Sequence, residues 1–88
     1  MPDAPQRSVR FSRSAAKAYE KLPARIKEAC LAIIRELSAG EISGSKLKGE
    51  LAGLLSLRLG RAYRLLYRVG DEGIKIVDVG PRGDIYWK

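Results

Sequence analysis

The sequence contains no histidine and a single cysteine. Without histidine, the chain lacks the commonest general base and the commonest metal ligand in proteins. One cysteine excludes an internal disulfide, and Cys30 falls on the apolar stripe of a predicted helix, where we expect a buried and inert thiol. Metal-ligand spacings, glycine-rich phosphate loops and serine-nucleophile motifs are also absent from the sequence. We therefore expect a protein without a cofactor.

Long apolar runs are absent as well, and none approaches the length of a transmembrane helix. Residues 1–5 do not resemble a signal peptide, so we expect a cytoplasmic protein. Residues 1–7 contain two prolines and no apolar pattern, which predicts a flexible N-terminal tail. The remaining residues, 8–88, are enough for one small domain.

Acidic residues are scarce relative to basic ones: the chain has 10 against 17, and its net charge is +7. The excess is concentrated in residues 46–68, which hold six basic residues and one acidic residue. A diffuse excess could serve solubility alone, but clustered positive charge favours a polyanionic partner.

The hydrophobic pattern at the start of the domain predicts a strand followed by two helices. Residues 8–12 alternate between polar and apolar side chains, as in a short strand. Ser12 or Ser14 is the expected N-cap of the first helix, since a serine hydroxyl can accept a hydrogen bond from an unpaired backbone N–H. Pro23 separates the two helices, and Gly40 is the expected end of the second.

The second half of the sequence predicts a loop and then three or four antiparallel strands. Residues 41–53 are polar and contain several glycines, which indicates a loop with a helical turn at residues 47–51. The strands are expected at residues 55–59, 63–69, 74–79 and, as a short last segment, 84–88.

The first two of these strands form a hairpin with one register that keeps their apolar faces together. Pairing Leu59 with Tyr63 across a three-residue loop places Arg58 directly opposite Arg64. A shift by one residue would put an arginine into the apolar face. Like charges opposite each other destabilise a sheet. Either both side chains point into solvent, or an anion such as phosphate belongs between them.

The following strand extends the basic face of this hairpin. After a turn at residues 70–73, the expected pairing places Lys75 opposite Arg68. The same register places Asp78 on the apolar face, unless the sheet bulges or ends there.

These elements predict an α+β fold of order β-α-α-β-β-β(-β), in which a helical hairpin packs on one face of a twisted antiparallel sheet. The opposite face is basic, and we expect it to bind RNA. The residues expected to contact RNA are Arg58, Arg61, Arg68, Lys46, Lys48 and Lys75.

A basic face of this kind could also perform chemistry on a phosphodiester. Arginine donates two parallel hydrogen bonds to phosphate, so an arginine cluster could stabilise the charge that develops when a ribose 2′-OH attacks the adjacent phosphate. The reaction needs no metal ion, but it needs proton transfer, which Tyr86 or a lysine could provide. The other tyrosines lie on apolar faces, where we expect core residues: Tyr19, Tyr63 and Tyr67.

Four segments of the sequence carry a family resemblance. They are KLP at residues 21–23, KLKG at 46–49, LRLGRAYRLLY at 57–67 and VGPRGDIY at 79–86. In this order they resemble the RelE/ParE superfamily of type II toxin–antitoxin toxins, and the RelE branch more closely. The resemblance implies a RelE-like fold over residues 8–88 and a cognate antitoxin that holds the toxin inactive.

The resemblance also implies a catalytic set. By position, Arg64 matches the strand arginine linked to transition-state stabilisation, Arg82 the arginine after the last long strand, and Tyr86 the C-terminal tyrosine. The paired lysines that some members carry would fall at Leu54 and Ser56, so both are missing here.

Three functions follow as hypotheses. In the RelE branch the free toxin enters the ribosomal A site and cleaves mRNA, so the first hypothesis is a metal-independent mRNA endoribonuclease that inhibits translation on the ribosome. The second is a ParE-like inhibitor of DNA gyrase without catalysis. The third is a plain nucleic-acid-binding module whose basic face supplies affinity alone.

Overall fold

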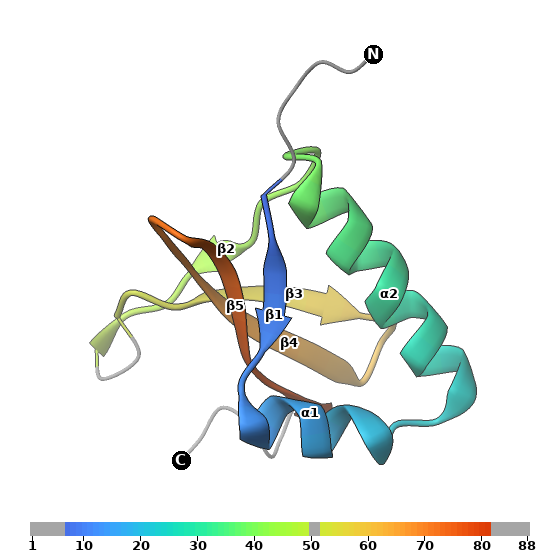
Figure 1. Ribbon diagram of the computed structural model, residues 1–88. Coiled ribbons are helices and arrows are strands. Elements are labelled where there is room, and N and C mark those ends of the chain that lie inside the picture. The colour runs from blue at the N-terminus through green and yellow to red at the C-terminus, as the bar shows by residue number, and fades with distance from the viewer. Residues whose placement is uncertain (1–6, 50–51, 82–88) are drawn as a thin grey trace.

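The computed structural model describes residues 7–49 and 52–81 (Figure 1). In chain order its elements are β1 (Val9–Phe11), α1 (Arg13–Glu20), α2 (Ala24–Ser38), β2 (Ser45–Lys46), β3 (Leu55–Leu59), β4 (Tyr63–Gly70) and β5 (Gly73–Pro81). The strands form one sheet in the order β1-β5-β4-β3-β2. The short strand expected at residues 84–88 lies outside the described residues. Within the described part of the chain, neither helix is long and apolar enough to span a bilayer.

The predicted α+β architecture is confirmed, because both helices pack on one face of the sheet around a shared core. The helices and the turn between them contribute Ala15, Leu22, Ile26, Cys30 and Leu37 to this core. The strands contribute Leu59, Leu65, Tyr67, Ile74, Ile76 and Val79. The predicted core tyrosines agree with this arrangement, since Tyr67 is buried and both Tyr19 and Tyr63 pack against the buried cluster.

Ser12, one of the two expected caps, is the N-cap of α1. Its hydroxyl accepts a hydrogen bond from the Ala15 backbone N–H at 3.0 Å and donates one to the Val77 carbonyl, also at 3.0 Å. The cap therefore ties the start of α1 to β5 as well as satisfying an unpaired N–H. At the other end of the helical hairpin, α2 stops before Gly40, whose φ of 76° suits glycine.

The first strand differs from the expected antiparallel arrangement. β1 runs parallel to β5, with Val9 beside Ile74 and Phe11 beside Ile76, so the sheet is mixed at this edge. Parallel neighbours need a long connection between them. The helices and the other strands supply that connection here, and a local sequence pattern does not reveal such a distant pairing.

The loop expected at residues 41–53 contains a further strand, β2, which pairs with β3. Two residues are too few to produce a recognisable alternation. The segment before β2 is also fixed, because the Gly44 backbone N–H donates a hydrogen bond to the Tyr67 hydroxyl at 2.7 Å. A Cβ on Gly44 would lie 2.6 Å from the Ser56 carbonyl oxygen, so only glycine fits this close approach. Of the helical turn expected at 47–51, residues 50 and 51 lie outside the described range.

A β-bulge resolves the difficulty at Asp78. The β4–β5 register shifts between Leu66 and Tyr67, so Tyr67 pairs with Ile76 and Leu66 pairs with Asp78. Val77 is the extra residue. The bulge moves Asp78 from the apolar face to the opposite one, where its carboxylate accepts a hydrogen bond from the Val79 backbone N–H at 2.9 Å.

The described part of the chain begins at Arg7, the last residue of the expected tail. The Arg7 N–H donates to the Ser38 carbonyl at 3.0 Å, and the Ser38 hydroxyl donates to the Arg7 carbonyl at 2.7 Å. Arg7 is therefore anchored at the end of α2. Residues 1–6 lie outside the described range.

Candidate nucleic-acid interface

The β3–β4 hairpin has the register expected from its alternation. Leu59 pairs with Tyr63, and Arg58 lies directly opposite Arg64; these two arginines are called the hairpin pair below. The connecting turn contains Gly60 at a φ of 68°, in the left-handed region that glycine adopts readily. Because the buried leucines fix the apolar face toward the helices, both arginines are held on the opposite face, called the basic face below.

The two arginines of the hairpin pair differ in burial. Arg58 is exposed, whereas Arg64 is half-buried and its Nε atom is inaccessible to solvent. On the other side, Arg64 is paired with Gly80 of β5, which has no side chain. The half-buried guanidinium of Arg64 on the central strand therefore lies opposite the exposed guanidinium of Arg58 on β3, which suits binding of a phosphate between them.

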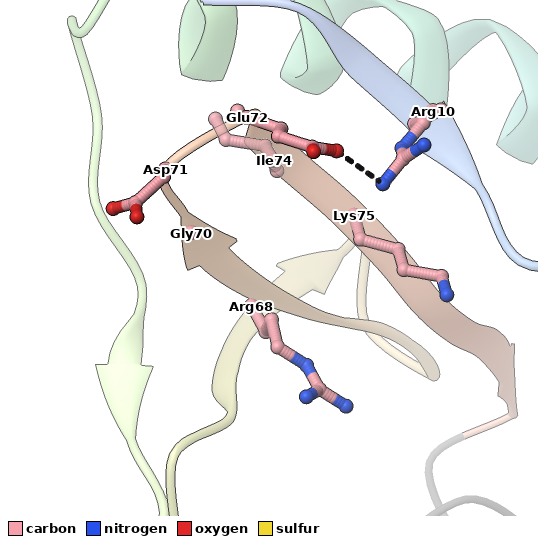
Figure 2. A pocket seen from close by; sticks show the side chains of 8 residues that line it. Arg10, Arg68, Gly70, Asp71, Glu72, Ile74 and Lys75 are labelled. Atoms are coloured by element: carbon pink, nitrogen blue, oxygen red, sulfur yellow. Dashed lines mark ion pairs between the residues drawn. The ribbon is translucent and has the colours of Figure 1, made fainter.

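A second basic cluster crosses three neighbouring strands. Arg68 pairs with Lys75 as expected, and Lys75 pairs with Arg10 of β1. We call Arg68, Lys75 and Arg10 the three-strand row. Figure 2 shows their side chains around a hollow of about 380 Å³ at the β4–β5 turn. Arg10 forms an exposed ion pair with Glu72 at 3.5 Å.

Arg10 is the functional candidate that the sequence interpretation missed. The alternation of Val9, Arg10 and Phe11 already indicates that Arg10 points away from the core. What the sequence does not reveal is the parallel pairing of β1 with β5, which places Arg10 beside Lys75.

The two clusters are separated along the central strand. Arg68 follows Arg64 by four residues along β4, which corresponds to about 13 Å at the usual rise of a strand. The positions between them are apolar or neutral: Leu66 is 3% exposed and its β3 partner Ser56 is 5% exposed. Positive charge on the basic face is thus arranged as two groups, and the acidic Asp78, the β5 partner of Leu66, lies between them.

The remaining expected contacts do not join these groups. Lys46 pairs with Leu55, so it lies on the helix side of the sheet edge, and Lys48 follows in the next turn. Arg61 lies in the hairpin turn and lines a separate hollow of about 420 Å³ together with Arg25 of α2. Arg82 and Tyr86, two of the three expected catalytic residues, lie outside the described residues.

The described residues offer neither a metal site nor a reactive thiol. Residues 7–49 and 52–81 contain no group of three or more histidine, cysteine, aspartate or glutamate residues that could hold a metal ion. Burial raises the pKa of the Cys30 thiol to about 11, so this thiol is protonated at neutral pH and unsuited to nucleophilic attack. Burial also raises the pKa of Tyr19, which packs edge-on against Phe11 with ring centroids 5.6 Å apart.

Comparison with known sequences identifies a family. Residues 9–86 match the model of the ParE toxin of type II toxin–antitoxin systems, parDE. The chain is also similar to Toxin RelG of Mycobacterium tuberculosis, with 42% identity over 87 residues that cover 90% of this chain and 94% of the relative.

Comparison with solved structures points to the same family as the sequence comparison. The toxin–antitoxin complex RelBE2 of Mycobacterium tuberculosis contains a chain with 40% identity and a TM-score of 0.75, covering 90% of this chain and 94% of that one. The archaeal RelE–RelB complex of Pyrococcus horikoshii matches at 27% identity and a TM-score of 0.70, covering 90% and 98%.

Proposed function

The chain belongs to the ParE toxin family of type II toxin–antitoxin systems and is a toxin of the RelE kind; from this premise we propose that it is an endoribonuclease that cleaves mRNA on the ribosome. The observation that carries the proposal is the hairpin pair, in which Arg58 and Arg64 face each other on the basic face. Such a like-charge pair weakens a free sheet. Bound phosphate would turn this repulsion into a binding contribution.

The proposed reaction is an attack of a ribose 2′-OH on its adjacent phosphate. The O2′–P bond forms while the P–O5′ bond breaks, which leaves a 2′,3′-cyclic phosphate and a free 5′-hydroxyl. Arg64 is half-buried on the central strand, so its guanidinium can stabilise the developing negative charge with little reorganisation. Arg58, which is exposed, can follow the phosphate as it binds.

Proton transfer completes the proposed reaction. The 2′-OH must lose a proton and the leaving 5′-oxygen must gain one. We assign Arg82 a second contact to the phosphate and Tyr86 a part in proton transfer, both by position in the family pattern. These two assignments rest on the sequence alone.

We further propose that a cognate antitoxin holds the toxin inactive in the cytoplasm. The RelBE2 and RelE–RelB structures are complexes of a toxin with its antitoxin. The net charge of +7 on this chain suits a partner with an acidic segment.

Inhibition of DNA gyrase without RNA cleavage is the alternative. Ser56 is one of two positions where some RelE-type toxins carry a lysine; here it is a buried serine, so it supplies no basic group. This observation favours the alternative, because a catalytic set without that lysine has one group fewer for proton transfer.

Induction of the toxin in cells, followed by primer extension on a reporter mRNA, distinguishes RNA cleavage from gyrase inhibition. Cuts within translated codons that disappear in the Arg64→Ala variant support the nuclease. Intact mRNA together with an SOS response and cleaved DNA supports gyrase inhibition. Binding to nucleic acid without mRNA cleavage or DNA damage would support the third hypothesis, a plain nucleic-acid-binding module.

A further inference from the structure

The three-strand row forms a site that is distinct from the hairpin pair. Neighbouring strands lie about 4.8 Å apart, so Arg68, Lys75 and Arg10 place three cationic side chains in succession across β4, β5 and β1. They border the hollow of about 380 Å³ shown in Figure 2. Among the described residues, the one ion pair in this row joins Arg10 to Glu72. The hollow is therefore cationic on its strand side and acidic at its turn.

The contact between Arg10 and Glu72 is weak enough to be replaced. Their side chains are 62% and 82% exposed, and the distance between Nη2 of Arg10 and Oε1 of Glu72 is 3.5 Å. An ion pair so exposed contributes about 0–1 kcal/mol. A phosphate oxygen offers Arg10 charge-assisted hydrogen bonds of at least equal strength.

We propose that the three-strand row binds a second phosphate of the same RNA strand, and that Glu72 lowers the affinity by competing for Arg10. The inference rests on the proposed function, since it takes the first phosphate to lie at the hairpin pair. It adds Arg10 as a binding residue and assigns the β4–β5 turn a role in setting affinity.

The spacing of the two clusters favours a nucleic-acid strand. About 13 Å separates Arg64 from Arg68 along β4, a distance that a few nucleotides of a single strand can span. A single strand carries a phosphate at each step, so it can place one phosphate at each cluster without a special fold. The two clusters lie on either side of Leu66, Ser56 and the acidic Asp78, so the intervening nucleotides receive no cationic contact from β4.

The test is equilibrium binding of short RNAs to the purified full-length toxin. The probe is a fluorescently labelled RNA decamer with 2′-O-methyl riboses, which cannot be cleaved, measured by anisotropy at several KCl concentrations. A matching trinucleotide, too short to reach both clusters, is measured by competition. Circular dichroism melts verify that each variant folds.

Two variants of the turn provide a matched pair. Glu72→Gln and Asp71→Asn each remove one negative charge, but Asp71 points away from Arg10 (Figure 2). We expect Glu72→Gln to bind the decamer up to about fivefold more tightly, as loss of a competing contact of up to about 1 kcal/mol implies. Asp71→Asn should change the affinity much less.

Removing a positive charge from the three-strand row should have the opposite effect on RNA affinity. Arg10→Gln should weaken binding of the decamer and lower the slope of log affinity against log salt by about 0.7, the value for one phosphate of a single strand. Its affinity for the trinucleotide should stay that of the wild type.

The outcomes separate this inference from the proposed function. If Arg64→Ala weakens decamer binding while Arg10→Gln and Glu72→Gln leave it unchanged, the three-strand row is not a phosphate site and the proposed function stands. If none of the three substitutions alters RNA binding, both proposals fail. If Arg10→Gln impairs binding of an acidic antitoxin peptide alone, the row is a protein contact and the inference is overturned.

Discussion

Arg58 and Arg64 are directly paired across the β3–β4 hairpin, so two positive charges oppose each other on the basic face of the sheet. Cross-strand like charges destabilise a sheet by a few tenths of a kcal/mol up to about 1 kcal/mol. Arg58→Gln should therefore raise the free energy of unfolding by about 0.2–1 kcal/mol at low salt, and less in 0.5 M KCl because salt screens the repulsion.

Urea unfolding at the two salt concentrations measures this gain. Lys48→Gln is the control, since it removes the same charge from an exposed position outside the hairpin pair. An equal gain in both variants would mean that net charge rather than the hairpin pair is responsible. The stabilised Arg58→Gln variant should at the same time lose RNA affinity.

Tyr67 should stabilise the fold through its hydroxyl as well as its ring. Tyr67→Phe leaves the Gly44 N–H without the hydrogen bond of 2.7 Å that it now makes. We expect a loss of about 1–3 kcal/mol in the free energy of unfolding, because the donor is partly buried. Thermal melts of Tyr67→Phe and of the control Tyr19→Phe, whose ring contact with Phe11 is kept, measure the difference. Equal melting temperatures would contradict the role assigned to the Gly44 contact.

Cys30 makes stability depend on pH in the alkaline range. Its pKa in the folded protein is raised to about 11, whereas an unfolded cysteine has a pKa of about 8.5. Because the folded state holds the proton more tightly, this contribution is complete below the unfolded pKa and is lost as the pH rises toward 11.

The measurement is the midpoint of urea unfolding between pH 8 and 11. Cys30→Ala is less stable overall because it leaves a cavity, but its decline with pH should be shallower than that of the wild type. Parallel curves would contradict the burial of the thiol. In the same pH range the native protein should react slowly with thiol reagents and the unfolded protein rapidly.

The sequence predicted the parts of the fold that depend on neighbouring residues. Alternation alone gave the hairpin register, because a shift by one residue would bury Arg58 or Arg64. The same reasoning placed Lys75 opposite Arg68 and identified Asp78 as a point of conflict, which the structure relieves by a bulge. These features follow from local patterns of charge and hydrophobicity.

What the sequence could not predict depends on pairings between distant residues. β1 lies parallel to β5, so Arg10 reaches the basic face through a contact that spans most of the chain. β2 is too short for a pattern, and its position follows from its pairing with Ser56 and Leu55. The sequence also grouped Lys46 with the RNA-binding residues, although its register places it on the helix side.

Arg82 and Tyr86, assigned from the family pattern, should affect catalysis without affecting folding. Arg82→Ala and Tyr86→Phe are each expected to lower the cleavage rate, because they remove a phosphate contact and a proton-transfer group respectively. Melting temperatures within about 2 °C of the wild type would show that the lower cleavage rate is not caused by loss of structure. A variant that cleaves normally, or one that unfolds, would refute the assignment for that residue.

The central claim is that Arg64 stabilises the transition state of RNA cleavage. Its most direct test is the single-turnover rate of mRNA cleavage on purified ribosomes programmed with a defined message. We expect cleavage by the wild type, a rate about 10²–10³-fold lower for Arg64→Ala, and partial activity for Arg64→Lys, which keeps the charge without the planar fork. Absence of cleavage by the wild type, or an unchanged rate for folded Arg64→Ala, would contradict it.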